Sequence, residues 1–409
     1  MSTACPQIPQ VDHRSQKACR ANRTAEFTLL LTCCARPAID GYDLEHVLNT
    51  GNLIGFIKLA LEHRVVPQVY RFLLAHSEFL TRSELSIVRT TYEDSARRAL
   101  CLSSELARVV RHLENRGIKA MPYKGPLLAE ALYGDVTARQ FCDLDILVPP
   151  GGVPAAKKAL SDLGYKPQIS LQLPEERQFI ASGYEYAFDG VAGPHALELK
   201  WRILPRFYSV DFDIETLFAR AEQVNLGGRS FATLCEDDLL LVLCVHAAKH
   251  IWVQLSWVCD IAELAGSPKI HWDIVWAAAE RLGIRRILAV SVMLAHRLLG
   301  SDLPNLLQNW CGQDSLSEIL TEQISCRLSE GTSCETESLD YFNFMLRLRE
   351  RWRDRLRFLW RLVWTPGTGE WSAVRLPENL AFVYHLVRLG RLVCKVFGSR
   401  LAACGETPN

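Results

Sequence analysis

The stretch IKAMPYKGPLLAEALYGDVTARQFCDLDILV, residues 118–148, decides the fold of this chain. A short apolar run ends in a Lys-Gly pair at 124–125, a helix-like segment follows over residues 126–133, and a second apolar run carries Asp143 and Asp145. Residues i and i+2 of a β-strand lie on one face, so we expect the two aspartates to point the same way. Two carboxylates about 6–7 Å apart along one strand are half of a hard-cation site.

Lys124 and Gly125 suit the binding of a phosphate. A glycine at a strand-to-helix turn lets backbone N–H groups approach a phosphate, and a neighbouring lysine adds a positive charge. The helix that we expect from Pro126 to Tyr133 then directs its positive end towards that phosphate. Carboxylates for a metal beside a phosphate-binding turn indicate nucleotide chemistry.

Residues 195–203, HALELKWRI, contain a third carboxylate in a strand-like run. Glu198 stands between two leucines and is a candidate third metal ligand beside Asp143 and Asp145. Three carboxylates repel one another when no cation is bound, so we expect Glu198→Gln to stabilise the metal-free protein. Alternation puts Glu198, Lys200 and Arg202 on one face of this strand and His195, Leu197, Leu199 and Trp201 on the other.

Taken in order, these motifs resemble the nucleotidyltransferase-like family of the DNA polymerase β superfamily, in its large, mostly bacterial branch. The resemblance rests on KG at 124–125, YGD at 133–135, Arg139 and DLDILV at 143–148, and it extends from about Leu102 to about Leu264. This branch carries Lys-Gly where the wider superfamily has a Gly-Ser turn. Family members often have histidine where this chain has Lys200.

The resemblance implies an enzyme that binds an NTP such as ATP with Mg²⁺ (or Mn²⁺) and transfers a nucleoside monophosphate to an acceptor hydroxyl. The acceptor, whether small molecule, peptide or protein, is left open. Two other functions also stay open: a catalytically inactive nucleotide-binding protein, and an adaptor at a membrane surface or on a polyanion. The implied catalytic residues and metal ligands are Asp143, Asp145 and Glu198, and the implied nucleotide-binding residues are Lys124, Gly125 and Arg139.

Arg139 has an alternative role, because surface pairing is the commoner fate of an arginine. It could form a salt bridge with Asp143 or Asp145. By resemblance, we favour a role in the site.

The expected fold class is α/β, with a mixed-sheet core between mostly helical N- and C-terminal parts. Strand-like and helix-like runs from Ile118 onwards give the order β-α-β-α-β-β, typical of an α/β sheet unit. Leu102, Leu106, Val109 and Leu113 mark one face of a preceding amphipathic helix. We divide the chain into a disordered tail (1–24), a helical domain (25–116), the core (117–230) and a helical domain (231–409).

Composition sets the outer limits. The 409 residues carry no formal net charge, so no overall field attracts nucleic acid and we expect no nucleic-acid partner. The 14 cysteines include no C-x-x-C pair, which argues against a zinc ribbon or a redox motif. The N-terminal residues have no apolar run typical of a secretion signal, so we expect a cytoplasmic protein with reduced, mostly buried cysteines.

His246 and His250 stand four residues apart in HAAKH, within a helical pattern from Glu236 to Leu264 that we expect to be one unbroken helix. The motif lacks the glutamate of zinc proteases. We favour buried histidines that are hydrogen-bonded to neighbours such as Asp260. The alternative is a helix that closes over the nucleotide, with His246, Lys249 or His250 lining the cleft.

Residues 346–364 form an Arg-rich segment, predicted to be a helix, whose seven arginines and two acidic residues give a local net charge of +5. Interleaved tryptophans make it suited to a phosphate-rich partner or to an anionic membrane surface. The alternative is pairing with acidic residues elsewhere in the protein. The apolar segment 376–396 is too charged to span a membrane, which leaves peripheral membrane contact open.

Overall fold

The computed structural model describes residues 24–35, 53–169, 171, 173–190, 193–331, 338–365, 387–388 and 390. The predicted tail lies outside these residues except for Thr24, and so does most of the apolar segment 376–396. Among the described residues, no helix is both long and apolar enough to cross a membrane.

A mixed five-stranded sheet forms the core, which confirms the predicted fold class. Its strand order is β1-β2-β5-β4-β3. β2 runs parallel to β5, and the other neighbouring pairs are antiparallel. The strands are β1 (Met121–Pro122), β2 (Leu144–Leu147), β3 (Lys166–Pro167), β4 (Glu185–Gly190) and β5 (Gly193–Lys200).

Three helices connect these strands: α7 (Gly125–Tyr133), α8 (Val153–Asp162) and α9 (Leu173–Ser182). The predicted β-α-β-α-β-β order is present, but β3 and α9 were missed. β3 has only two residues, too few for an alternating pattern to be visible in the sequence. After the sheet come α10 (Ile214–Ala219) and a hairpin of β6 (Glu222–Leu226) and β7 (Arg229–Thr233), so the predicted boundary at residue 230 falls inside β7.

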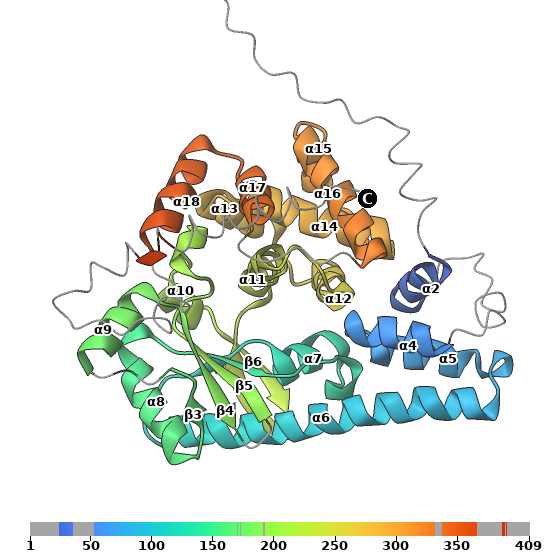
Figure 1. Ribbon diagram of the computed structural model, residues 1–409, viewed down its shortest axis with the longest axis horizontal. Helices are drawn as coiled ribbons and strands as arrows, with labels where there is room; N and C mark the ends of the chain where they lie inside the picture. The colour runs from blue at the N-terminus through green and yellow to red at the C-terminus, as the bar shows by residue number, and fades with distance from the viewer. Residues whose placement is uncertain are drawn as a thin grey trace, which may run out of the picture.

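A helix of 33 residues, α6 (Arg82–Glu114), runs along the length of the molecule beneath the sheet and α7 (Figure 1). Thr81 and Glu84 form a capping box at its start. Its predicted apolar face is buried in the core of the α/β unit. At its end, Gly117 adopts a φ of +68° and the Ile118 N–H donates to Leu113 O at 3.1 Å, which is a glycine-based helix stop.

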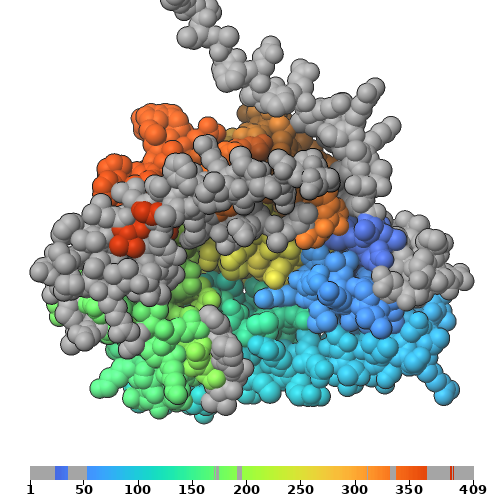
Figure 2. Space-filling model, viewed as in Figure 1, coloured from blue at the N-terminus to red at the C-terminus, as the bar shows by residue number. Residues whose placement is uncertain are grey.

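The helices before and after the α/β core share one hydrophobic core, although they are far apart in the sequence. Figure 2 shows the N-terminal helices in blue against the C-terminal helices in orange. In Figure 1, α11 and α12 lie between the sheet and the later helices. The elements are α2 (Ala25–Cys34), α4 (Leu53–Glu62), α5 (Val66–Ala75), α11 (Glu236–Lys249), α12 (Leu255–Ala265), α13 (Trp272–Leu282), α14 (Arg285–Leu299), α15 (Asn305–Cys311), α16 (Ser315–Glu330), α17 (Leu339–Arg347) and α18 (Trp352–Trp364).

The helix predicted to run unbroken over residues 236–264 is two helices, so that prediction was wrong. α11 and α12 are separated by a turn at 250–254, in which Ile251 and Trp252 have φ angles of +52° and +49°. Residues other than glycine adopt such angles only where surrounding contacts compensate. Trp252 is fully buried and its Nε1 donates to Ser291 Oγ at 3.1 Å, so tertiary packing fixes the turn.

The Arg-rich segment is also interrupted, between α17 and α18. Arg349, in this turn, is only 2% exposed, and its Nη2 donates to Tyr208 O at 2.5 Å. Arg361 pairs with Asp211 at 2.7 Å. The prediction of one helix over residues 346–364 was therefore wrong at this turn, where a distant carbonyl binds the Arg349 guanidinium. The Arg361–Asp211 pair fits the alternative of pairing with acidic residues elsewhere in the protein.

Most cysteines of the described residues are free thiols, as expected. Burial raises the pKa of the Cys244 thiol to about 12, so this group stays protonated. Cys326 forms a disulfide, and the expectation of reduced cysteines was wrong there. Sequence spacing carries no information about such a contact in three dimensions.

A buried ion pair joins the α/β core to α12. Arg139 donates from Nε to both carboxylate oxygens of Asp260, at 3.0 and 2.9 Å, and its Nη2 lies 2.9 Å from Asp260 Oδ2. Tyr133 OH donates to Asp260 Oδ1 at 3.0 Å. The alternative partners considered for Arg139, Asp143 and Asp145, were therefore wrong.

We expect Asp260→Ala to lower the free energy of unfolding by about 3–5 kcal/mol, because it leaves the buried Arg139 without a counter-charge. Chemical denaturation measures this change. The matched control is Asp211→Ala, which removes the more exposed partner of Arg361 and should cost about 1 kcal/mol or less. Equal losses in both variants would contradict a central role for the buried pair.

Candidate active site

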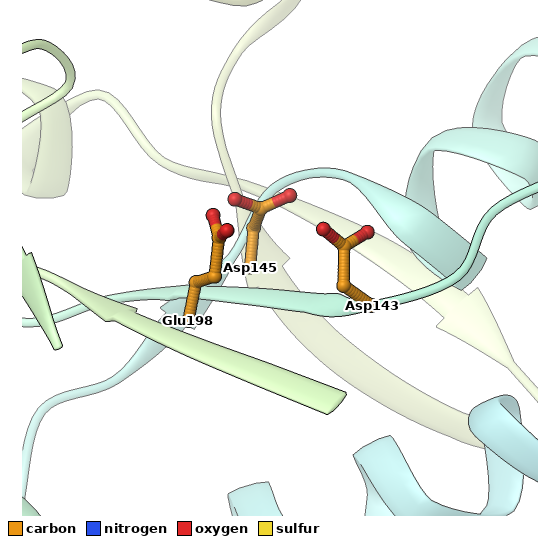
Figure 3. A group of neighbouring side chains, drawn as sticks. All are labelled: Asp143, Asp145 and Glu198. Atoms are coloured by element: carbon orange, nitrogen blue, oxygen red, sulfur yellow. The ribbon is translucent and has the colours of Figure 1, made fainter. Parts of the chain in front are cut away.

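Three carboxylates converge at the pairing of β2 with β5. Asp143 directly precedes β2, and Asp145 within β2 lies opposite Glu198 of β5 in the parallel register. One carboxylate oxygen from each residue lies within 4.8 Å of the others. Figure 3 shows the three side chains pointing to the same side of the two strands. Leu197 and Leu199, on the opposite face, are fully buried, as alternation predicts.

The residues present fit a divalent cation that prefers oxygen ligands, such as Mg²⁺ or Mn²⁺. Asp145 Oδ1 is buried and has no hydrogen-bond partner among the described residues. Burial, together with repulsion from Asp145 and Glu198, raises the pKa of Asp143 to about 6. A cation placed among the three oxygens would bind this oxygen of Asp145 and remove the repulsion.

Lys200 lies within this cluster of carboxylates. Its Nζ is 2.5 Å from Glu198 Oε2, 3.3 Å from Asp145 Oδ1 and 2.5 Å from Glu185 Oε2. Burial opposes the charged form, but attraction by Glu185, Glu198 and Asp145 is stronger and raises the pKa of Lys200 well above its usual value. Glu185 lies opposite Lys200 in the β4–β5 pairing and is not one of the three converging carboxylates.

The contact with Lys200 argues against the expectation that Glu198→Gln relieves repulsion. Attraction by Lys200 lowers the pKa of Glu198, so in this environment its charged form is favoured. The carboxylate whose charged form is disfavoured is Asp143. The sequence could not distinguish the two, because the difference depends on where the Lys200 ammonium lies.

The Lys-Gly turn has the geometry expected for a phosphate-binding turn. Gly125 opens α7 with a φ of +56°, and a Cβ atom there would lie 3.3 Å from Asp143 O, so a side chain is disfavoured twice. No side chain caps the N-terminus of α7, and Pro126 at its second position contributes no N–H group, so the N–H of Gly125 is the first that could bind a phosphate. Lys124 is buried, with Nζ 3.5 Å from Asp145 Oδ2.

All of these groups line one cavity of about 370 Å³. α11, α12 and the turn between them form its opposite wall. The cavity brings together all six predicted site residues, which are Lys124, Gly125, Arg139, Asp143, Asp145 and Glu198, and it adds Arg64, Lys200, His246, Lys249, His250, Gln254 and Trp257.

His246 and His250 line this cavity, as the alternative interpretation predicts, and the hydrogen-bond partner that we favoured, Asp260, was wrong. Asp260 binds Arg139 and Tyr133 instead. Lys124 Nζ donates to His246 Nδ1 at 3.2 Å. Burial, and then the charge of Lys124, lowers the pKa of His246 well below its usual value, so the imidazole is neutral and accepts this bond.

The cavity wall is held by residues from the C-terminal part. Tyr341 OH donates to the backbone oxygen of Lys249 at 2.7 Å, at the end of α11, and its hydroxyl also contacts Tyr208 OH. Arg349 binds the backbone of the same Tyr208. α17 therefore fixes the position from which Lys249 enters the cavity.

Some of these site residues left a signal in the sequence and others did not. Alternation placed Lys200 on the face of Glu198, and Lys249 was part of the alternative interpretation of HAAKH. Glu185, Arg64 and Gln254 left no signal, because each reaches the site through a turn or strand pairing that only tertiary contacts determine.

A mixed sheet with two aspartates two residues apart on one strand, and a glutamate opposite on the next, defines a nucleotidyltransferase type of site. A family model described as an uncharacterised nucleotidyltransferase matches residues 53–300, more than half of the chain, so this chain belongs to that family. Comparisons with curated proteins and with solved structures found no match. The resemblance drawn from the motifs is confirmed, and the match begins well before Leu102 and ends at residue 300.

We expect Asp143→Asn to stabilise the metal-free protein above pH 6. The folded protein binds the Asp143 proton more tightly than the unfolded chain does, because its pKa rises from 3.8 to about 6. The free energy of unfolding therefore falls as the pH rises through this window, by up to about 3 kcal/mol. Denaturation in a chelator at pH 4, 6 and 8 should show this slope in the wild type and a weaker slope in the variant.

Glu198→Gln is the matched control for this experiment. Its carboxylate is stabilised by Lys200, so we expect the variant to be less stable than the wild type at pH 8. Stabilisation by Glu198→Gln but not by Asp143→Asn would show that the charge of Glu198, and not that of Asp143, destabilises the metal-free protein.

Proposed function

We propose that this protein transfers a nucleoside monophosphate from an NTP such as ATP to an acceptor hydroxyl, in the cytoplasm and with Mg²⁺ (or Mn²⁺). One observation carries the proposal. The carboxylates of Asp143, Asp145 and Glu198 converge within 4.8 Å in a cavity that the open N-terminus of α7 also lines. Metal ligands and a phosphate-binding turn in one cavity are what nucleotidyl transfer requires.

Each site residue has a role in this proposal. Asp143, Asp145 and Glu198 would hold the cation, which when bound neutralises phosphate charge and activates the acceptor hydroxyl. Lys124 and the Gly125 backbone bind the triphosphate. Arg139 lines the same cavity while it pairs with Asp260, so it positions α12 beside the nucleotide.

The transfer is an in-line displacement at the α-phosphorus. The acceptor hydroxyl releases its proton to water, its oxygen forms a bond to this phosphorus, the bond to the bridging oxygen breaks, and pyrophosphate leaves. The ion pair with Glu185 holds the Lys200 ammonium in place, so the positive charge of Lys200 stays beside the reacting groups.

We expect Asp145→Asn to abolish Mg²⁺-dependent ATP binding and any transfer without unfolding the protein. The change keeps the side-chain size and removes a charge from the cation site. Calorimetry with Mg²⁺ and ATP, and product analysis with labelled NTPs, measure these effects. The control is Asp162→Asn, which alters a surface aspartate paired with Arg116. Unchanged metal affinity in Asp145→Asn would end the proposal.

A nucleotide-binding protein without transfer activity is the second candidate. Lys200 contacts Asp145 and Glu198, and an ammonium in this place neutralises carboxylates as a metal would. ATP binding that persists in a chelator and survives Asp145→Asn would favour this candidate. Binding that requires Mg²⁺ would favour the enzyme.

A membrane-surface role has one observation in its favour, which lies on α18. Trp352 and Trp360 are 65% and 66% exposed, and Arg353 and Arg357 are exposed beside them. Arg351 and Arg355, by contrast, bind backbone oxygens of Glu280 and Arg349. The exposed groups of α18 suit the interface of an anionic bilayer.

For this role we expect Arg353→Gln with Arg357→Gln to weaken binding to phosphatidylserine vesicles about 30-fold, from about 1 kcal/mol per arginine. Vesicle co-sedimentation over a range of salt concentrations measures the change. Arg82→Gln with Arg89→Gln, two exposed arginines of α6, is the control. If the wild type shows no salt-dependent binding, the arginines of α18 are structural.

A further inference from the structure

Two cations that line the cavity have no carboxylate partner. Arg139 pairs with Asp260, Lys124 lies beside Asp145, and Lys200 binds three carboxylates. Among the described residues, neither Arg64 nor Lys249 lies within ion-pair distance of a carboxylate. Both come from the helical part of the molecule and line the same cavity as the carboxylates.

The backbone around Arg64 holds this side chain in place. Arg64 lies between α4 and α5 with a φ of +55°, a left-handed angle that costs free energy for an arginine. The preceding residue, His63, is buried and bound to the start of α12. Ser256 N–H donates to His63 O at 3.1 Å, and Leu255 N–H donates to His63 Nδ1 at 3.3 Å. The turn is therefore fixed against the cavity wall.

Lys249 is held equally firmly. Its backbone oxygen accepts the bond from Tyr341, and its Nζ donates to Tyr184 OH at 3.4 Å and lies 5.1 Å from the centre of the Tyr184 ring. Neither contact supplies a negative charge. Burial lowers the pKa of the Lys249 ammonium, and attraction by Glu185 and Glu198 offsets only part of this effect. An oxyanion bound in the cavity would therefore stabilise its charged form.

The two cations act on the same part of the cavity. Both cations act on His250, which lines the cavity with them. Burial, and then the charges of Lys249, Lys124, Lys200 and Arg64, lower the pKa of His250 to about 3. The neutral His250 imidazole carries no negative charge, so it does not compensate the charges of Arg64 and Lys249. Gln254, in the turn that lines the same wall, has a buried Oε1 without a hydrogen-bond partner among the described residues, which can accept a bond from a ligand hydroxyl.

We propose that Arg64 and Lys249 form an oxyanion-binding subsite on the helical wall of the cavity, for a phosphate or carboxylate group of a substrate. Guanidinium and ammonium groups bind such oxyanions through charge-assisted hydrogen bonds. The group belongs either to an anionic acceptor or to the triphosphate of the nucleotide. Only this choice of source rests on the proposed function, because the subsite itself is defined by the protein's own cations.

The test is calorimetric titration of the full chain with inorganic phosphate, and separately with Mg²⁺ and ATP. We expect Arg64→Gln and Lys249→Gln each to weaken the binding of one of these probes about tenfold or more. The matched controls are Arg71→Gln and Lys58→Gln, which remove exposed cations of α5 and α4. Arg64→Lys restores the charge and should recover part of the affinity, which a purely structural role of Arg64 does not predict.

The outcomes separate the two sources of the oxyanion. If phosphate binds together with Mg²⁺ and ATP, and both variants bind phosphate more weakly, the subsite belongs to an anionic acceptor. Weaker ATP binding in both variants, with phosphate excluded by ATP, assigns it to the nucleotide. If neither probe is affected in folded variants, the proposal is overturned. Failure of the Asp145→Asn test alone leaves the phosphate result intact, so the two proposals fail independently.

Discussion

The parallel pairing of β2 with β5 is the constraint on which the rest of this structure depends. It sets Asp145 opposite Glu198, and like charges placed opposite each other in a sheet destabilise it. Lys200, two residues beyond Glu198 and on the same face, offsets part of this cost, and Glu185 on β4 holds the ammonium in place. The sheet can therefore keep carboxylates together that would otherwise repel one another.

Asp143 is the carboxylate for which this compensation is incomplete. It precedes β2, is largely buried, and has its pKa raised by burial and by its two acidic neighbours. A charge that weakens the metal-free fold is retained at the place where a cation would be bound. Stability is thus lost at the position where the proposed function needs negative charge.

The helical parts complete the site as well as the fold. Helices from both ends of the described chain share one core above the sheet, and they supply the cavity wall that carries Arg64, His246 and Lys249. The family match ends at residue 300, yet Tyr341 of α17 binds the backbone of Lys249. The cavity therefore depends on residues outside the matched region.

The sequence by itself determined the features that depend on local geometry. Alternation along a strand put Asp143 and Asp145 on one face and Glu198 on the face of Lys200, and a glycine before an apolar helix predicted the turn at Gly125. These follow from the two-residue period of a strand and from the φ angle that glycine tolerates. The same local reasoning found the buried face of α6.

Only the tertiary structure decided which charges meet. The partner of Arg139 is Asp260, and the turn between α11 and α12 is fixed by the burial of Trp252, so neither could be derived from helical periodicity. The sign of the Glu198 electrostatics depended on Lys200 and Glu185 meeting across strands. Such contacts join residues far apart in the chain, and the free energy of a buried charge is set by neighbours that no sequence spacing specifies.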